Sequence, residues 1–173
     1  MRRFTNWYLS LNIYSKLSPF LLLCMFLCLV FAPNKIAGDE ERYLCFVNNL
    51  YNGYYTLFYP DFILLGGPDY PLFLAPFIIL KLPLYVLRLL NGLFLYFSLV
   101  INYKIISEFS SKRNTFSYTV LLGLCFLIYQ MLPLILTESF TWFLISLVCY
   151  LFIISYMRNK ISWKLIFLTP LSG

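Results

Sequence analysis

The sequence predicts an all-α integral membrane protein with about four transmembrane helices and the start of a fifth. Three observations predict this class: the composition, several long apolar runs, and the placement of charge between them. Hydrophobic residues make up 61% of the 173 residues and charged residues 12%, against roughly 45–50% and about 25% in soluble proteins. The mean hydropathy is +0.79. Lipid must therefore cover part of the surface.

Charge and cysteine content exclude several classes of function. The net charge is +6, but the basic residues fall in short clusters between apolar runs, as in cytoplasmic loops, so no nucleic-acid partner is predicted. The chain has no histidine, which removes histidine-based catalysis. Cys24 and Cys28 are one helical turn apart, but no second cysteine pair follows them. We therefore predict neither a zinc site nor a disulfide framework.

The first predicted span runs from Leu17 to Asn34 without a charge, and its length of about 27 Å suits a hydrocarbon core. A cleaved signal peptide is the alternative, but the long basic region before it and the lack of a small-residue cleavage site favour a retained helix. Residues 34–83 form the first outer loop. Within it, residues 40–54 predict a short amphipathic helix, because Tyr43, Phe46, Val47 and Leu50 share one face at 3, 4 and 7 spacing. Pro71 to Leu82, too short to cross, predicts an interfacial helix.

Three further runs are long enough to cross the membrane: Leu84 to Ile106, Phe116 to Leu136 and Ser139 to Met157. Pro83 separates the first of them from the interfacial helix, because proline breaks a helix. Leu165 to Gly173 reads as the start of another helix. We therefore expect residues 1–173 to be the N-terminal portion of a longer transmembrane domain, or a truncated relative of one.

The charges also predict an orientation. With the N-terminus inside, most of the basic residues fall on the cytoplasmic side, as the positive-inside rule requires. These are Arg2, Arg3, Lys16, Lys104, Lys112, Arg113, Arg158, Lys160 and Lys164. All of the acidic residues except Glu108 then fall outside. The predicted location is the cell (inner or plasma) membrane, with the polar outer loop facing away from the cytoplasm.

A candidate site gathers at this outer face. The run from Asp39 to Tyr43 packs three acids, a base and a tyrosine together just after a span. Glu138 stands alone between two apolar runs, where an ionisable group is costly and is by default a functional candidate. The alternative is a solvated loop and a helix cap formed by Thr137 or Glu138.

The residue types of this site suggest two kinds of chemistry. A carboxylate can accept a proton from a hydroxyl or amine nucleophile, and a guanidinium can hold a phosphate by two hydrogen bonds. Clustered acids can instead bind a divalent cation such as Mg²⁺ or Mn²⁺. The spacing of the residues does not choose between them.

The run Gly38-Asp39-Glu40-Glu41-Arg42-Tyr43 resembles the "DE-x-R-Y" signature of GT-C membrane glycosyltransferases. The nearest branch includes dolichyl-phosphate-mannose protein mannosyltransferases and bacterial aminoarabinose transferases. Later segments resemble the same family in the same order: residues 66–73 its "G-x-P-x-x-P-L-Y" stretch, residues 88–90 the entry to its second span, and residues 136–140 the acidic opening of its fourth span. The usual basic residue before Pro71 is absent; Asp69 and Tyr70 stand there.

The resemblance implies a role for each matching position. Asp39 would be the catalytic carboxylate, and Arg42 would hold the phosphate of a polyprenyl carrier. Glu40 belongs to the same signature as a substrate-binding residue, and Tyr43 and Tyr70 would line the pocket. Glu138 would orient substrate, or a metal such as Mg²⁺ or Mn²⁺ where one is used.

The implied reaction is transfer of a sugar from a polyprenyl-phosphate-linked donor to a lipid, glycan or protein acceptor, with inversion at the anomeric carbon. Two other classes stay open: a small transporter subunit, and a non-catalytic membrane assembly protein. The transporter class would need ionisable residues inside the spans, and the sequence places almost none there.

Overall fold

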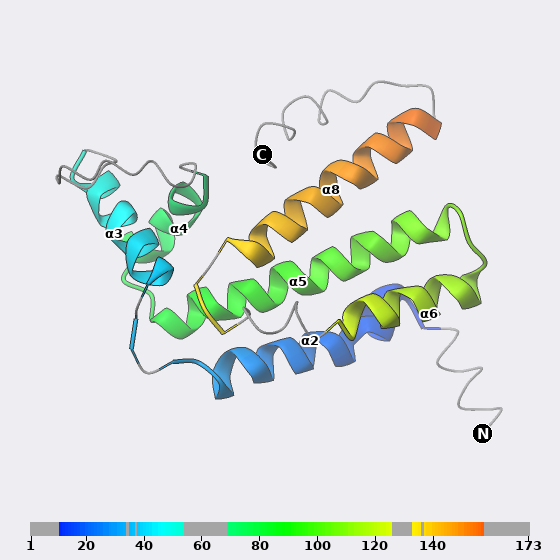
Figure 1. Ribbon diagram of the computed structural model, residues 1–173, viewed down its shortest axis with the longest axis horizontal. Helices are drawn as coiled ribbons and strands as arrows, with labels where there is room; N and C mark the ends of the chain where they lie inside the picture. The colour runs from blue at the N-terminus through cyan, green and yellow to red at the C-terminus, as the bar shows by residue number, and fades with distance from the viewer. Residues whose placement is uncertain are drawn as a thin grey trace.

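The computed structural model describes residues 11–33, 35–36, 38–53, 69–125, 133–135 and 137–157. Every regular element in these ranges is a helix. In chain order the helices are α2 (Ile13–Val30), α3 (Asp39–Tyr51), α4 (Asp69–Ile79), α5 (Leu84–Ser107), α6 (Lys112–Gly123) and α8 (Glu138–Met157) (Figure 1).

Three of these helices, α2, α5 and α8, are long and apolar enough to cross a membrane. Large apolar side chains on α2 and α8 point away from the rest of the chain; Leu22 is 70% exposed and Phe152 is 58% exposed. A water-soluble bundle would bury such side chains, so their exposure suits contact with lipid. The length, composition and exposed surface of the three helices together indicate a membrane protein.

Helix α5 is the centre of the bundle, and it packs against α2, α6 and α8 (Figure 1). On the α2 side, a Cβ atom built on Gly92 would lie 3.4 Å from the Cβ atom of Cys24 and 3.5 Å from the Sγ atom of Cys28. Small residues thus let the two backbones approach closely, as is common between membrane helices. On the α8 side, the Asn102 amide donates a hydrogen bond to the Ser146 hydroxyl at 2.8 Å.

Helices α3 and α4 pack against each other at one end of the bundle (Figure 1). Their contact forms one apolar cluster with α5 and the residues before α8, made of Val47, Tyr70, Leu74, Leu87 and Ile135. The chain turns from α4 towards α5 at Lys81, whose φ is 53°. The Lys81 and Leu82 amides donate to the carbonyls of Ile78 and Phe77, which is the usual pattern of a left-handed helix end.

Four of the predicted elements are confirmed with small shifts. The amphipathic helix is α3, with Phe46 and Val47 buried on its predicted face, and the short apolar helix is α4. The second and fourth predicted spans are α5 and α8.

The first span, α2, begins and ends about one turn earlier than predicted. The Asn12 side chain caps its start by accepting from the Ser15 amide at 2.8 Å. The helix stops at Val30 with Phe31 as its C-cap, and Pro33 follows two residues later, a common position for a proline because it cannot continue the helix.

The third predicted span, Phe116 to Leu136, is not one continuous helix. Ser111 caps α6 and starts it four residues before Phe116, and α6 ends at Gly123, with residues 133–135 outside any helix. Gly123 is in close contact with Phe20: a Cβ atom there would lie 2.7 Å from the Phe20 ring. Residues 126–132, and the predicted helix start at Leu165 to Gly173, lie outside the described residues.

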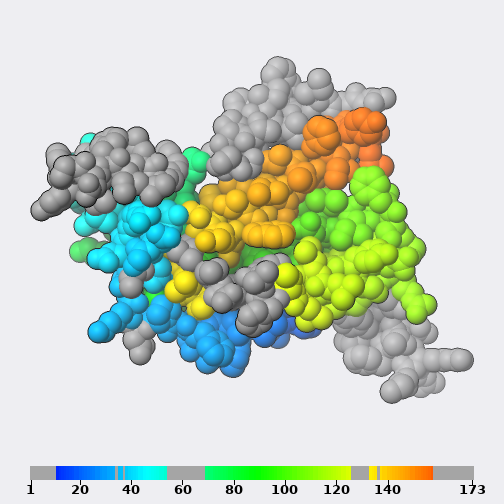
Figure 2. Space-filling view, in the orientation of Figure 1, coloured from blue at the N-terminus to red at the C-terminus, as the bar shows by residue number. Residues whose placement is uncertain are grey.

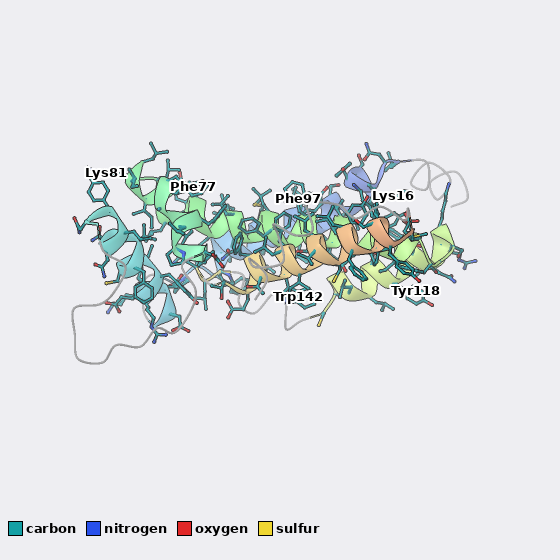
Figure 3. The ribbon with its side chains drawn as sticks, turned by 90° about the horizontal axis from the view of Figure 1, so that it is seen from above. Lys16, Phe77, Lys81, Phe97, Tyr118 and Trp142 are labelled. Carbon is teal, nitrogen blue, oxygen red and sulfur yellow. The ribbon has the colours of Figure 1, made fainter. Side chains whose placement is uncertain are left out.

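Three helices begin with an acidic residue at one end of the bundle (Figure 1). Lys16 is labelled at one end and Lys81 near α3 and α4 at the other (Figure 3). Asp39, Asp69 and Glu138 are the first residues of α3, α4 and α8, which start at the same end of the molecule (Figure 1). The acidic end predicted from the sequence is therefore a physical end of the bundle.

Candidate functional site

The first turn of α3 divides its charged residues between the interior and the surface. Asp39, Glu40 and Glu41 occupy this turn, where negative charge is favoured by the helix dipole. Successive residues on a helix point about 100° apart, so Glu40 turns inward while its neighbours turn outward. The Glu40 side chain is only 2% exposed, whereas those of Asp39 and Arg42 are 57% and 40% exposed.

Glu40 is the junction of three parts of the chain. One of its oxygens, Oε1, lies 3.5 Å from Nη2 of Arg88 on α5 and accepts the backbone N–H of Ile135 at 2.7 Å. One turn along α5 from Arg88, the Asn91 amide donates to the Leu134 carbonyl. Glu40, which the sequence predicted to bind substrate, is thus buried in an ion pair that links α3, α5 and the segment before α8.

Asp39 and Arg42 form the exposed counterpart of this buried pair. Nη1 of Arg42 lies 3.1 Å from Oδ1 of Asp39, one turn apart on α3. Exposed pairs of this kind contribute at most about 1 kcal/mol to stability. Because both partners face solvent and hold each other weakly, each remains available to a ligand that competes for it.

Tyr43 and Tyr70, both predicted to line the site, are in contact. Their rings meet edge to face with centroids 5.2 Å apart, and Tyr70 also lies against Phe140 of α8 at 5.7 Å. The Tyr70 hydroxyl is buried and has no hydrogen-bond partner among the described residues. Burial, followed by the neighbouring Tyr43, Glu138 and Glu40, raises the pKa of Tyr70. Tyr70 is therefore a neutral donor at the edge of the acidic end.

Glu138 is exposed at the first position of α8, and it is close enough to influence the ionisation of Tyr70. Its position fits the helix-opening role expected of it as well as a role towards a ligand. In the space-filling view, α3 and the beginning of α8 lie at the same end of the molecule (Figure 2). Asp39, Arg42, Tyr43, Tyr70 and Glu138 are therefore gathered at one end of the bundle.

Three groups that organise this end were not predicted as site residues: Arg88, Asn91 and the backbone N–H of Ile135. Arg88 could have been identified from the sequence, because an arginine inside an apolar run needs a partner. Asn91 is an ordinary polar residue in a span, and a backbone amide has no signature in sequence. Their roles depend on which segments meet in space.

A divalent cation, one of the two kinds of chemistry left open by the sequence, finds no ready-made set of ligands in the described part of the chain. No three or more acidic, cysteine or histidine side chains come together there. The side chains of Asp39 and Glu138 would need further oxygen ligands to hold Mg²⁺ or Mn²⁺.

Comparisons of the chain with protein-family models, with curated proteins and with solved structures find no match.

Proposed function

We propose that the chain is part of a membrane glycosyltransferase that moves a sugar from a polyprenyl-phosphate carrier to an acceptor at the outer face of the membrane. The observation that carries the proposal is the exposed Asp39–Arg42 pair, 3.1 Å apart, at the end of a bundle of apolar helices. A base and a phosphate holder lie side by side there, next to the surface in which a polyprenyl chain would be embedded.

The chemistry follows from the two groups. The donor phosphate replaces Asp39 as the partner of the Arg42 guanidinium, which binds phosphate oxygens well. The freed Asp39 carboxylate takes the proton from the acceptor hydroxyl or amine as that atom attacks the anomeric carbon. The bond between the anomeric carbon and the phosphate oxygen breaks, and polyprenyl phosphate leaves with the electron pair. One displacement inverts the anomeric centre.

The surroundings of the pair suit an amphipathic donor. Helix α4 exposes Leu72 and Ile79, which fits a helix lying in the membrane interface. Glu138 is exposed beside Tyr70, and a polar group of this kind can bind the hydroxyls of a sugar. The orientation with this end outside follows from the positive-inside rule.

The transporter alternative is weaker. Within the described spans the charged residues lie within about five residues of a helix end. They are Lys16, Arg88, Lys104 and Glu138. A proton or ion pathway normally carries such groups at mid-membrane depth.

The test uses protein expressed from its complete open reading frame and reconstituted in liposomes with a radiolabelled polyprenyl-phosphate sugar and membrane acceptors. Asp39→Asn keeps the shape of the side chain and removes the base. We expect transfer to fall by roughly 10²- to 10⁴-fold, the usual contribution of a general base. Glu41→Gln, an exposed neighbour on the same helix turn, is the matched control and should retain transfer. Undiminished transfer by well-folded Asp39→Asn protein contradicts the proposal.

A further inference from the structure

The buried Glu40–Arg88 pair adjoins the exposed Asp39 in the first turn of α3. We infer that Glu40 and Arg88 are positioning residues, which hold the exposed carboxylates of Asp39 and Glu138 in a fixed relation and do not themselves touch substrate. This inference rests on the proposed function, and it assigns Glu40 a different task from the direct substrate contact that the sequence motif implies.

Burial separates Glu40 and Arg88 from any ligand. Their side chains are 2% and 8% exposed, against 57% for Asp39. The Oε1 atom of Glu40 already has two partners, Arg88 Nη2 and the Ile135 amide. A substrate would have to displace protein groups from the interior to reach it.

The pair connects the two exposed carboxylates through short pieces of chain. Asp39 precedes Glu40 directly in the first turn of α3, and Glu138 follows Ile135 by three residues. The bond from Asn91 to the Leu134 carbonyl holds the same segment to α5. A displacement of Glu40 therefore moves Asp39 relative to Glu138, although neither exposed side chain is altered.

Removing one partner and removing both have different consequences. Without the Glu40 charge, Arg88 is left as a buried cation, and its Nε atom already lacks a hydrogen-bond partner in the described part of the chain. An unpaired buried charge is strongly unfavourable, whereas replacing both charges by groups of similar shape is often tolerated. In Glu40→Gln the amide oxygen can still accept the Ile135 N–H.

The kinetic test compares Glu40→Gln, Arg88→Met and the double variant in the transfer assay. A displacement of about 1 Å can lower the rate by on the order of 100-fold, so we expect each single variant to lose about that factor in kcat with the donor KM nearly unchanged. The kcat of the double variant should be about tenfold higher than that of either single variant, because no unpaired charge is left. Arg113→Met, an exposed charge removed at the other end of the bundle, is the control for loss of a cation and should match the parent.

A raised donor KM in Glu40→Gln, with a double variant no better than the single one, would mean that Glu40 contacts substrate and would overturn the inference. Such a result leaves the role of Asp39 intact, since that role is tested separately by Asp39→Asn.

A second measurement does not depend on activity. Spin labels at Tyr51 on α3 and Tyr156 on α8, both exposed, are introduced into a variant without the natural cysteines. The distance distribution between them should be narrow in the parent, broad in Glu40→Gln and narrow again in the double variant. A distribution that stays narrow and unshifted in Glu40→Gln refutes positioning by this pair, whatever reaction the protein catalyses. If no form of the protein transfers sugar, the proposed function fails while this measurement still decides the inference.

Discussion

Gly92 of α5 lies against Cys24 and Cys28 of α2, and enlarging it should open that contact. Leucine at this position would place its branched carbon atoms beyond a Cβ that already lies 3.4 Å from the Cβ atom of Cys24 and 3.5 Å from the Sγ atom of Cys28. Both cysteines are fully buried, so there is no room for the added atoms unless α2 moves away. Gly92→Leu is therefore the perturbation that tests the packing of the bundle.

The size of the effect follows from the contact distances. Overpacking of an interior contact typically costs about 1–3 kcal/mol. Gly92→Ala is the matched control, because its single added carbon stays at ordinary contact distance, and alanine is better than glycine in a helix by up to about 1 kcal/mol. We therefore expect opposite signs: the leucine variant less stable, the alanine variant as stable as the parent or slightly more so.

The reactivity of the natural cysteines reports on this contact, so no labelling site has to be engineered. Cys24 and Cys28 are buried, whereas Cys125, just past the end of α6, is exposed and provides an internal reference. A buried thiol reacts only in the locally opened state, so its labelling rate is proportional to the equilibrium population of that state. A loss of about 1–3 kcal/mol should accelerate maleimide labelling of the buried pair by roughly 5- to 150-fold, while labelling of Cys125 is unaffected. Equal labelling rates in the parent and Gly92→Leu would refute the close approach of α2 and α5.

Two further outcomes are expected. Tyr70→Phe should raise stability by about 1 kcal/mol, because it removes a buried hydroxyl without a partner. Since the folded pKa of Tyr70 is raised above its ordinary value of 10.0, the parent should lose stability as the pH rises above about 10; thermal unfolding at several pH values should show that Tyr70→Phe lacks this loss. In intact cells, a membrane-impermeant thiol reagent should label single cysteines at the exposed positions of Glu41 and Glu138 but not at Lys112. Labelling at Lys112 would overturn the orientation. Glu41 is preferred to Glu40 for this test, because Glu40 is buried.

Local patterns accounted for most of the helices. The long apolar runs predicted α2, α5 and α8, and Pro83 correctly separated α4 from α5. The 3, 4 and 7 spacing of apolar residues predicted the buried face of α3. These features depend on the chemistry of neighbouring residues, so they can be read without knowing what each helix packs against.

The prediction of one continuous third span was wrong, because a tertiary contact lies where the helix ends. The run after Phe116 is apolar enough to suggest one span, yet α6 ends at Gly123, where the Phe20 ring of α2 occupies the space beside the backbone. Hydropathy measures the preference of a segment for lipid and not the continuity of its helix.

The sequence by itself determined that this is a membrane-type helical chain whose acidic residues, Glu108 excepted, are predicted on one side of the membrane, because hydropathy, helix length and charge are properties of local segments. Only the tertiary structure decided which of the adjacent acids is buried. Glu40 meets Arg88, 48 positions away, and the Ile135 amide, 95 positions away, while Asp39 stays at the surface. The physical reason is that burying a charge is tolerable only where an opposite charge and a hydrogen-bond donor are in place. Their position is set by the cluster in which α3, α4, α5 and the segment before α8 meet.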